Sequence, residues 1–205
     1  MIFSAGPHIL ESEKERNLYT KFFAGYFFNE LVDGYDDRVN LISDYLSDKL
    51  EIPISLNKPA LSFDNHAYLL DLKSDKGEFA DILIHDAQSK TMIAIEAKYL
   101  TNWSIEKDIK CNINRIESIR QKYPTYKIYF CLLVSDIKWN ATEKMKNHPD
   151  SNFTRFKNEF KNEVGVLFWE ELVKLCKSTS VREYMYYRLS LVNAPVEKRY
   201  ATIQN

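Results

Sequence analysis

The sequence predicts an α/β fold in which helices flank a mixed central sheet. Hydrophobic residues make up 45% of the 205 residues and aromatic residues 14%, which is enough for a sizeable core. Apolar residues first recur at helical spacing, and the pattern then changes to the alternation and continuous runs that are typical of strands. The length suits a single domain over 1–205. We expect its core to span about 11–135, followed by a C-terminal extension over about 136–205.

Two helices are predicted ahead of the first strand. Over 11–31 the apolar residues form one broad stripe, and Ser12 and Glu15 have the spacing of a capping box at its start. A second helix is predicted over 38–50, where apolar residues again recur at helical spacing, and Pro53 ends it.

A change to period two predicts strands over 67–72, 79–85 and 91–99, with a polar turn over 86–90 joining the last two. Alternation divides the side chains of the second strand between two faces: Ala80, Ile82 and Ile84 on one, and Asp81, Leu83 and His85 on the other. Asp81 is therefore a charged residue in the middle of a strand.

The remaining predicted elements are a helix over 104–123, a strand over 127–134, a helix over 153–160, a strand over 164–168 and a helix over 170–176. The strand over 127–134 is one continuous apolar run, which is typical of a strand buried on both faces. A hairpin series followed by a helical crossover predicts a mixed sheet. The chain beyond Asn193 is expected to be a loosely held tail.

Composition excludes several classes of protein. The formal net charge of -1 gives no global basic signature, so any contact with nucleic acid has to come from local patches. No GxxxxGK[ST] or GxGxxG phosphate loop occurs. The three cysteines form no CxxC and are expected to be reduced core thiols. With no signal-peptide pattern and no long apolar run, we expect a cytoplasmic protein without membrane contact.

Three strand residues carry the chemistry. Glu96 and Lys98 lie two apart, so they share one face at the end of their strand, and pairing through the 86–90 turn brings Asp81 close to Glu96. Neighbouring carboxylates repel each other unless a cation lies between them, and a hard divalent ion with oxygen ligands meets that need. We expect Mg²⁺, with Mn²⁺ as an alternative, held by Asp81, Glu96 and the carbonyl of Ala97. Lys98 then adds a fixed positive charge beside a scissile phosphate.

Asp81, the short turn and Glu96-Ala97-Lys98 after an apolar strand resemble the core motif of the PD-(D/E)xK nuclease superfamily, whose fold is restriction-endonuclease-like. Ala80 stands where the motif has its proline. The resemblance covers about 11–134 and implies an αβββαβ core. It also implies an endonuclease that hydrolyses phosphodiester bonds, in DNA more readily than in RNA, with Asp81, Glu96 and Lys98 as catalytic residues. Since many nucleases of this fold dimerise, it favours a homodimer.

Members of the superfamily often add an acidic residue from the first helix. Glu15 shares the inward face of that helix and is the candidate, although a capping-box role explains it equally well. Lys107, Lys110 and Asn114 lie on one side of the helix after the motif and are candidates for contact with a nucleic-acid backbone. A simply solvated lysine-rich face is the plainer explanation of that helix.

Three other interpretations remain open. Glu96 and Lys98 can be a solvated pair at a strand end. A non-catalytic nucleic-acid-binding or scaffolding module can keep a nuclease-like fold. A glycosidase acid pair leaves Lys98 without a role. Among the remaining candidates, His85 and Trp169 are expected to be packing residues, and Glu170 and Glu171 to lie near the positive end of a helix dipole.

Overall fold

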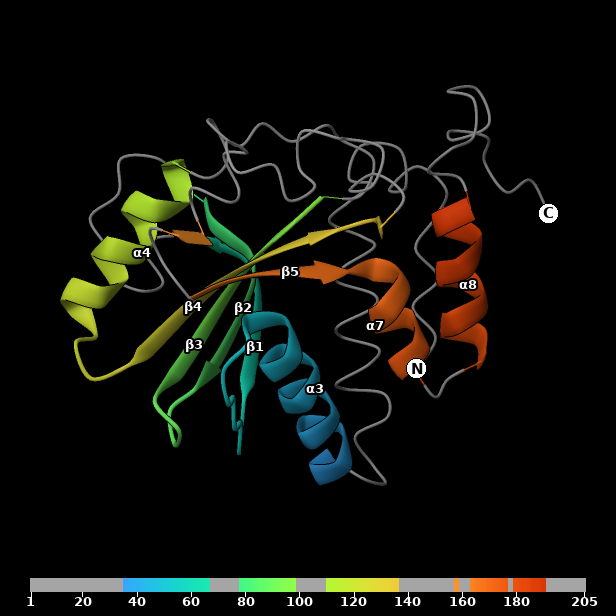
Figure 1. The fold of residues 1–205 in the computed structure, drawn as a ribbon, viewed down its shortest axis with the longest axis horizontal. Coiled ribbons are helices and arrows are strands. Elements are labelled where there is room, and N and C mark those ends of the chain that lie inside the picture. Colours follow the sequence, from blue (N-terminus) through green and yellow to red (C-terminus); the bar gives the residue numbers. More distant parts are fainter. Residues whose placement is uncertain are drawn as a thin grey trace.

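A computed structural model describes residues 35–66, 78–98, 110–136, 157–158, 163–176 and 179–190. The described elements are α3 (Tyr35–Leu50), β1 (Ala60–His66), β2 (Glu78–Asp86), β3 (Thr91–Ala97), α4 (Lys110–Lys122), β4 (Lys127–Val134), β5 (Val164–Phe168), α7 (Trp169–Leu175) and α8 (Thr179–Ser190) (Figure 1). The predicted helix over 11–31, the predicted strand over 67–72 and the predicted tail beyond Asn193 lie outside the described residues, as does almost all of the predicted helix over 153–160.

The described strands form one mixed sheet in the order β1-β2-β3-β4-β5. The β1–β2 and β2–β3 pairs are antiparallel, and the β3–β4 and β4–β5 pairs are parallel. Helix α4 packs on one face, while α3, α7 and α8 pack on the other (Figure 1). The predicted α/β class, with a mixed sheet between helices, is therefore confirmed. Strand β3 is central, as expected from its apolar sequence.

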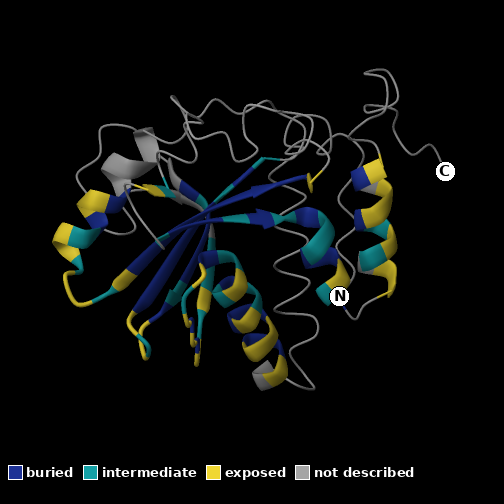
Figure 2. Ribbon diagram, viewed as in Figure 1, coloured by how far each residue is buried: buried dark blue, intermediate teal, exposed yellow. Residues whose placement is uncertain are grey.

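Burial follows from the alternation of side chains along the strands. In β4, the side chains of Tyr129, Cys131 and Leu133 join the core beside α3, and those of Phe130 and Leu132 join the core beside α4. All of β4 after Lys127 is buried (Figure 2). The prediction of a strand covered on both faces is thus confirmed.

Close packing of α3 on β5 depends on a glycine. A Cβ atom added to Gly165 would lie 3.0 Å from the carbonyl oxygen of Lys49 and 3.1 Å from Cδ2 of Leu50. The absent side chain lets the C-terminal turn of α3 rest directly on the sheet. The end of α3 is thereby fixed against β5, next to the start of α7.

Several predicted bounds agree with the structure. Strands β4 and β5 begin and end at the predicted residues. Helix α3 begins three residues earlier than predicted, and α7 begins and ends one residue earlier. The turn at 87–90 joins β2 to β3 as expected. Among the described helices, none is long and apolar enough to cross a membrane.

Two of the described elements were not predicted from the sequence. Strand β1 has only two large apolar residues at alternate positions, Leu61 and Phe63, before three polar residues. This alternation is too short to recognise as a strand. Helix α8 buries Met185 and Leu189 but exposes neighbouring tyrosines, so it shows no clean apolar stripe.

The predicted faces of β2 are wrong at one position. Ala80 packs in the core beside α4, although alternation had placed it with Ile82 on the opposite face. The β1–β2 register shifts between Asn65 and His66, whose partners are Ala80 and Glu78. Ala80 lies between this shift and the last pair of the β2–β3 ladder, Ile82–Ile95. It is therefore at the irregular end of β2, where pairing on both sides no longer enforces strict alternation.

Candidate active site

The β2–β3 hairpin brings Asp81 to the C-terminal end of β3. The last pair of their ladder joins Ile82 to Ile95, and Asp81 and Glu96 are the next residue along each strand. The Oδ2 atom of Asp81 accepts a hydrogen bond of 2.7 Å from the main-chain N–H of Ala97. The Asp81 side chain of β2 therefore contacts the main chain of Ala97, the residue between Glu96 and Lys98.

Glu96 and Lys98 form an ion pair on the same edge. The Nζ atom of Lys98 lies 2.8 Å from Oε1 of Glu96, and the two side chains are 18% and 15% exposed. Their spacing of two along an extended chain explains why they share one face. Because most of the surface of both side chains is buried, water screens their attraction less than that of a fully exposed pair.

The main chain of Lys98 is held at both of its polar groups. Its N–H donates to the carbonyl oxygen of Leu133 in β4, over 2.8 Å. Its own carbonyl oxygen accepts from Nε1 of Trp169, over 3.3 Å. Trp169 is fully buried and begins α7. The carboxyl ends of β3, β4 and β5 thus meet around Lys98, as parallel strands require.

Sequence reasoning expected Trp169 only to pack. The structure confirms its burial and adds the hydrogen bond of its indole N–H, which the sequence did not indicate. One signal was present, because a tryptophan directly after a buried strand lies at the same sheet edge as the residues after β3. Buried tryptophans generally need a partner for this N–H.

Glu170 ties the start of α7 to the end of β4. Its Oε1 atom accepts a hydrogen bond of 2.6 Å from the hydroxyl of Ser135, and its Oε2 atom accepts one of 2.8 Å from the main-chain N–H of Asp136. The predicted position in the first turn of a helix is confirmed. The carboxylate also fixes the chain where it leaves the sheet, so it has a structural role beyond interaction with the helix dipole.

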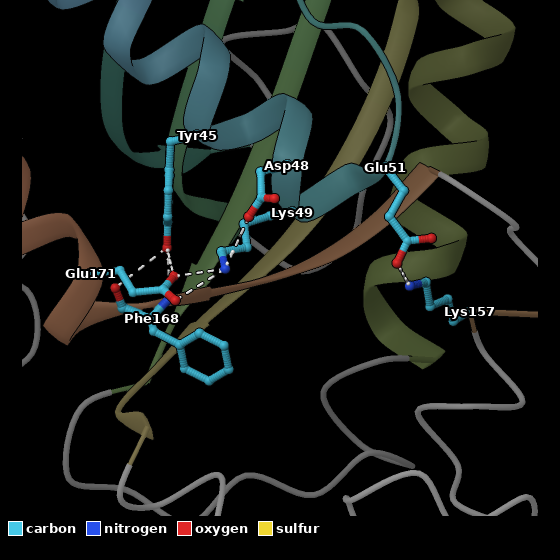
Figure 3. A network of polar contacts seen from close by, with 7 residues as sticks. All are labelled: Tyr45, Asp48, Lys49, Glu51, Lys157, Phe168 and Glu171. Carbon is cyan, nitrogen blue, oxygen red and sulfur yellow. Dashed lines mark hydrogen bonds and ion pairs between the residues drawn. The ribbon is translucent and has the colours of Figure 1, made fainter.

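Glu171 joins α7 to α3 (Figure 3). Its carboxylate accepts a hydrogen bond of 2.9 Å from the hydroxyl of Tyr45, whose oxygen in turn accepts one of 3.0 Å from the N–H of Phe168. Lys49 lies within 3.1 Å of both carboxylate oxygens of Glu171 and 3.2 Å from Asp48. Burial, and then the nearby charge of Glu171, hold the pKa of Tyr45 far above its usual value. Three successive residues of α7 therefore contact three different elements.

Other residues singled out from the sequence do not join this edge within the described part of the chain. Glu15 and Lys107 lie outside the described residues, and of Lys110 and Asn114 the structure describes only their place in α4. His85 lies at the far end of β2, where its Nε2 atom is 3.3 Å from the hydroxyl of Tyr126. His85 is half-buried and lies away from Asp81, Glu96 and Lys98.

The oxygen donors at this edge are of the kind that magnesium prefers. Among the described residues, no group of three or more histidine, cysteine, aspartate or glutamate side chains is arranged to hold a metal. Mg²⁺ commonly takes one or two carboxylates and completes its shell with water and substrate phosphate. Asp81, Glu96 and the carbonyl of Ala97 can supply the protein part of such a shell.

Comparisons of the chain with protein-family models, with curated proteins and with solved structures find no match. The interpretation of this edge therefore depends on its own residues and their contacts.

Proposed function

We propose that the chain is a metal-dependent nuclease that hydrolyses phosphodiester bonds, in DNA more readily than in RNA. The observation that carries the proposal is the contact of 2.7 Å between Asp81 and the N–H of Ala97. This contact brings a carboxylate from β2 to the Glu-Ala-Lys segment of β3. Two carboxylates and a lysine on one sheet edge form the residue set of the PD-(D/E)xK nucleases.

Each residue has a role in this reaction. Asp81 and Glu96, with the carbonyl of Ala97, hold Mg²⁺ or Mn²⁺, which when bound supplies a Lewis acid and an acidified water for attack on phosphorus. Lys98 lies beside Glu96, where its ammonium stabilises negative charge on the phosphate oxygens in the transition state. The hydrogen bonds to Leu133 and Trp169 fix the main chain from which this ammonium projects.

The arrangement of elements also supports the proposal. From α3 to β4 the described elements run helix, strand, strand, strand, helix, strand, which is the order of a restriction-endonuclease-like core. Under this proposal, Lys107, Lys110 and Asn114 contact the substrate backbone, and Glu15 completes the acidic set. A homodimer would allow both strands of a duplex to be cut.

A second candidate function is a non-catalytic nucleic-acid-binding or scaffolding module. It is favoured by the same contacts, since Lys98 already neutralises Glu96 and the N–H of Ala97 already satisfies one oxygen of Asp81. All three side chains can therefore serve the fold without a metal. This module would bind nucleic acid and leave it intact.

Cleavage of circular and linear DNA, with RNA in parallel, separates the two candidates. The wild-type protein is compared with Asp81→Asn and Lys98→Met in Mg²⁺ and in Mn²⁺, and Lys174→Met, an exposed lysine of α7, is the control. The nuclease predicts metal-dependent cutting that falls by at least about 100-fold in both site variants, because each removes a charge used in the transition state. The control keeps wild-type activity. Cutting that persists in Asp81→Asn would exclude the proposed site, and cutting by no protein would favour the module.

A further inference from the structure

Three turns meet at the end of the sheet opposite the candidate active site. They are the approach to β1 over 57–60, the β2–β3 turn over 86–91 and the α4–β4 connection over 123–127. The N–H of Lys127 donates to the carbonyl oxygen of Lys90 over 2.8 Å, which joins the last two turns. Thr91 and Glu96 lie five residues apart in β3, so about 17 Å of strand separates this end from the candidate active site.

Asp86 holds these turns together. Its Oδ2 atom accepts hydrogen bonds from the N–H groups of Asn57 and Lys58, and its Oδ1 atom accepts from those of Gln88 and Ser89, over 2.9 and 3.2 Å. The residue is 0% exposed. Burial acts to raise the pKa of Asp86, but the four hydrogen bonds outweigh it and hold the pKa below its usual value. The carboxylate is therefore charged but turned inward.

The outward charge at this end is positive. Lys58, Lys90, Lys122 and Lys127 are all exposed, and together they define the lysine-rich end. Asp86 is the one carboxylate among residues 55–60, 85–91 and 121–128 of the sequence. Within the described part of the chain, neither Lys58, Lys90 nor Lys127 forms an ion pair. This local excess of positive charge contrasts with a formal net charge of -1 for the whole chain.

Half-buried aromatic residues lie among these lysines. The rings of Tyr123 and Tyr126 meet edge to face with centroids 5.5 Å apart, and the ring of Tyr126 lies 5.4 Å from that of His85. The Nζ atom of Lys122 is 6.0 Å from the centroid of Tyr123. A basic surface interleaved with aromatic rings suits a polyanion whose charges alternate with flat groups.

We propose that the lysine-rich end binds the phosphate backbone of a nucleic-acid strand. Lysines offer point charges without the bidentate fork of arginine, which suits contact with phosphates and gives no reading of bases. Stable binding to a membrane surface is favoured by exposed apolar anchors beside the basic residues. Among the described residues, the exposed large hydrophobic side chains are Leu41, Tyr186 and Tyr187, and none of them belongs to these turns.

This binding surface is separate from the proposed nuclease chemistry. It lies at the other end of the strands, and it needs no metal. Binding can be measured with a chelator present, so loss of cleavage and loss of binding are distinct results. If both proposals hold, the lysine-rich end provides a second contact with the substrate.

The test measures anisotropy of fluorescent oligonucleotides of about 20 residues, single-stranded and duplex, across a salt series with chelator. The wild-type protein is compared with Lys90→Gln/Lys127→Gln. Lys157→Gln/Lys174→Gln is the charge-matched control. It removes two positive charges outside these turns, that of Lys157, which pairs with Glu51, and that of the exposed Lys174 in α7. Thermal unfolding of each variant shows that it is folded.

We expect the Lys90/Lys127 double variant to lose on the order of 10-fold or more in affinity at 0.1 M salt, and the slope of log K against log salt to fall by about 1.5 to 2. The control double variant keeps the wild-type slope. An equal loss in both double variants, or no loss in either, would overturn the proposal. So would a wild-type protein that binds vesicles of anionic lipid and neither oligonucleotide.

Discussion

The indole nitrogen of Trp169 lies 3.3 Å from the main-chain carbonyl oxygen of Lys98, and this contact joins the first residue of α7 to the candidate active site. The next two residues of α7 bond to the end of β4 and to α3. The first turn of α7 therefore connects three elements whose relative position determines where Lys98 stands. A change in α7 can alter the site without touching Asp81, Glu96 or Lys98.

Trp169→Phe should reduce catalysis by displacing Lys98. The substitution keeps most of the buried ring and removes the N–H, leaving the Lys98 carbonyl without this donor. We expect a stability loss of about 1–3 kcal/mol and a fall in kcat on the order of 10-fold. KM for DNA should change little, because the indole is buried away from solvent. Steady-state kinetics with urea unfolding measure both effects, and an unchanged kcat would show that Lys98 needs no such support.

Asp86→Asn should make stability less dependent on pH. The pKa of Asp86 is lowered in the folded state, so its contribution is present at neutral pH and is lost as pH falls through that lowered pKa. Asparagine has nearly the shape of aspartate but lacks the negative charge to which four main-chain N–H groups donate. We expect the free energy of unfolding to fall by about 2–3 kcal/mol at pH 7. Urea unfolding at neutral and acidic pH should show the difference between the two proteins shrinking in acid. A constant difference would contradict the assignment.

Lys90→Gly should stabilise the fold and weaken nucleic-acid binding. Lys90 has a φ of 52°, in the left-handed region where a side chain is strained. Glycine removes that strain but adds freedom to the unfolded chain, which leaves a net gain of about 0.5 kcal/mol. Glu51, with a φ of 57°, provides the control. Glu51→Gly also loses the exposed ion pair of Glu51 with Lys157, so it should gain somewhat less stability, and it should not reduce oligonucleotide affinity. Reduced binding in both variants would show that the Lys90 charge is not responsible.

The sequence predicted best the elements whose signal is local. Strands β4 and β5 appear at their predicted bounds because each is an apolar run that ends in a clear change of composition. Strand β1 was missed because its pairing with β2, and not its own sequence, makes it a strand. Ala80 lies beyond the last β2–β3 pair and next to the irregularity in the β1–β2 pairing, so alternation alone could not reveal its face.

The candidate site also has one part that local sequence patterns predict and one part that depends on contacts between distant residues. A charge in the middle of β2, and two residues sharing a face at the end of β3, were sufficient to predict that Asp81 and the Glu96-Ala97-Lys98 segment lie together. The hydrogen bond from Trp169 to Lys98 joins residues 71 apart in the sequence. This hydrogen bond depends on the direction in which α7 leaves β5, and no local sequence pattern indicates that direction.

The most direct test of the account is Mn²⁺ binding by the purified chain, measured from the loss of the free-ion signal in electron paramagnetic resonance. This measurement needs no knowledge of the preferred nucleic acid. It compares the wild type with Asp81→Asn and Glu96→Gln, and Glu117→Gln removes a charge from an exposed site of α4 as the control. The account predicts that the wild type and the control bind Mn²⁺ and that each site variant weakens binding by at least about 10-fold. Equal binding by the wild type and Asp81→Asn, or no binding by the wild type at millimolar Mn²⁺, would contradict it.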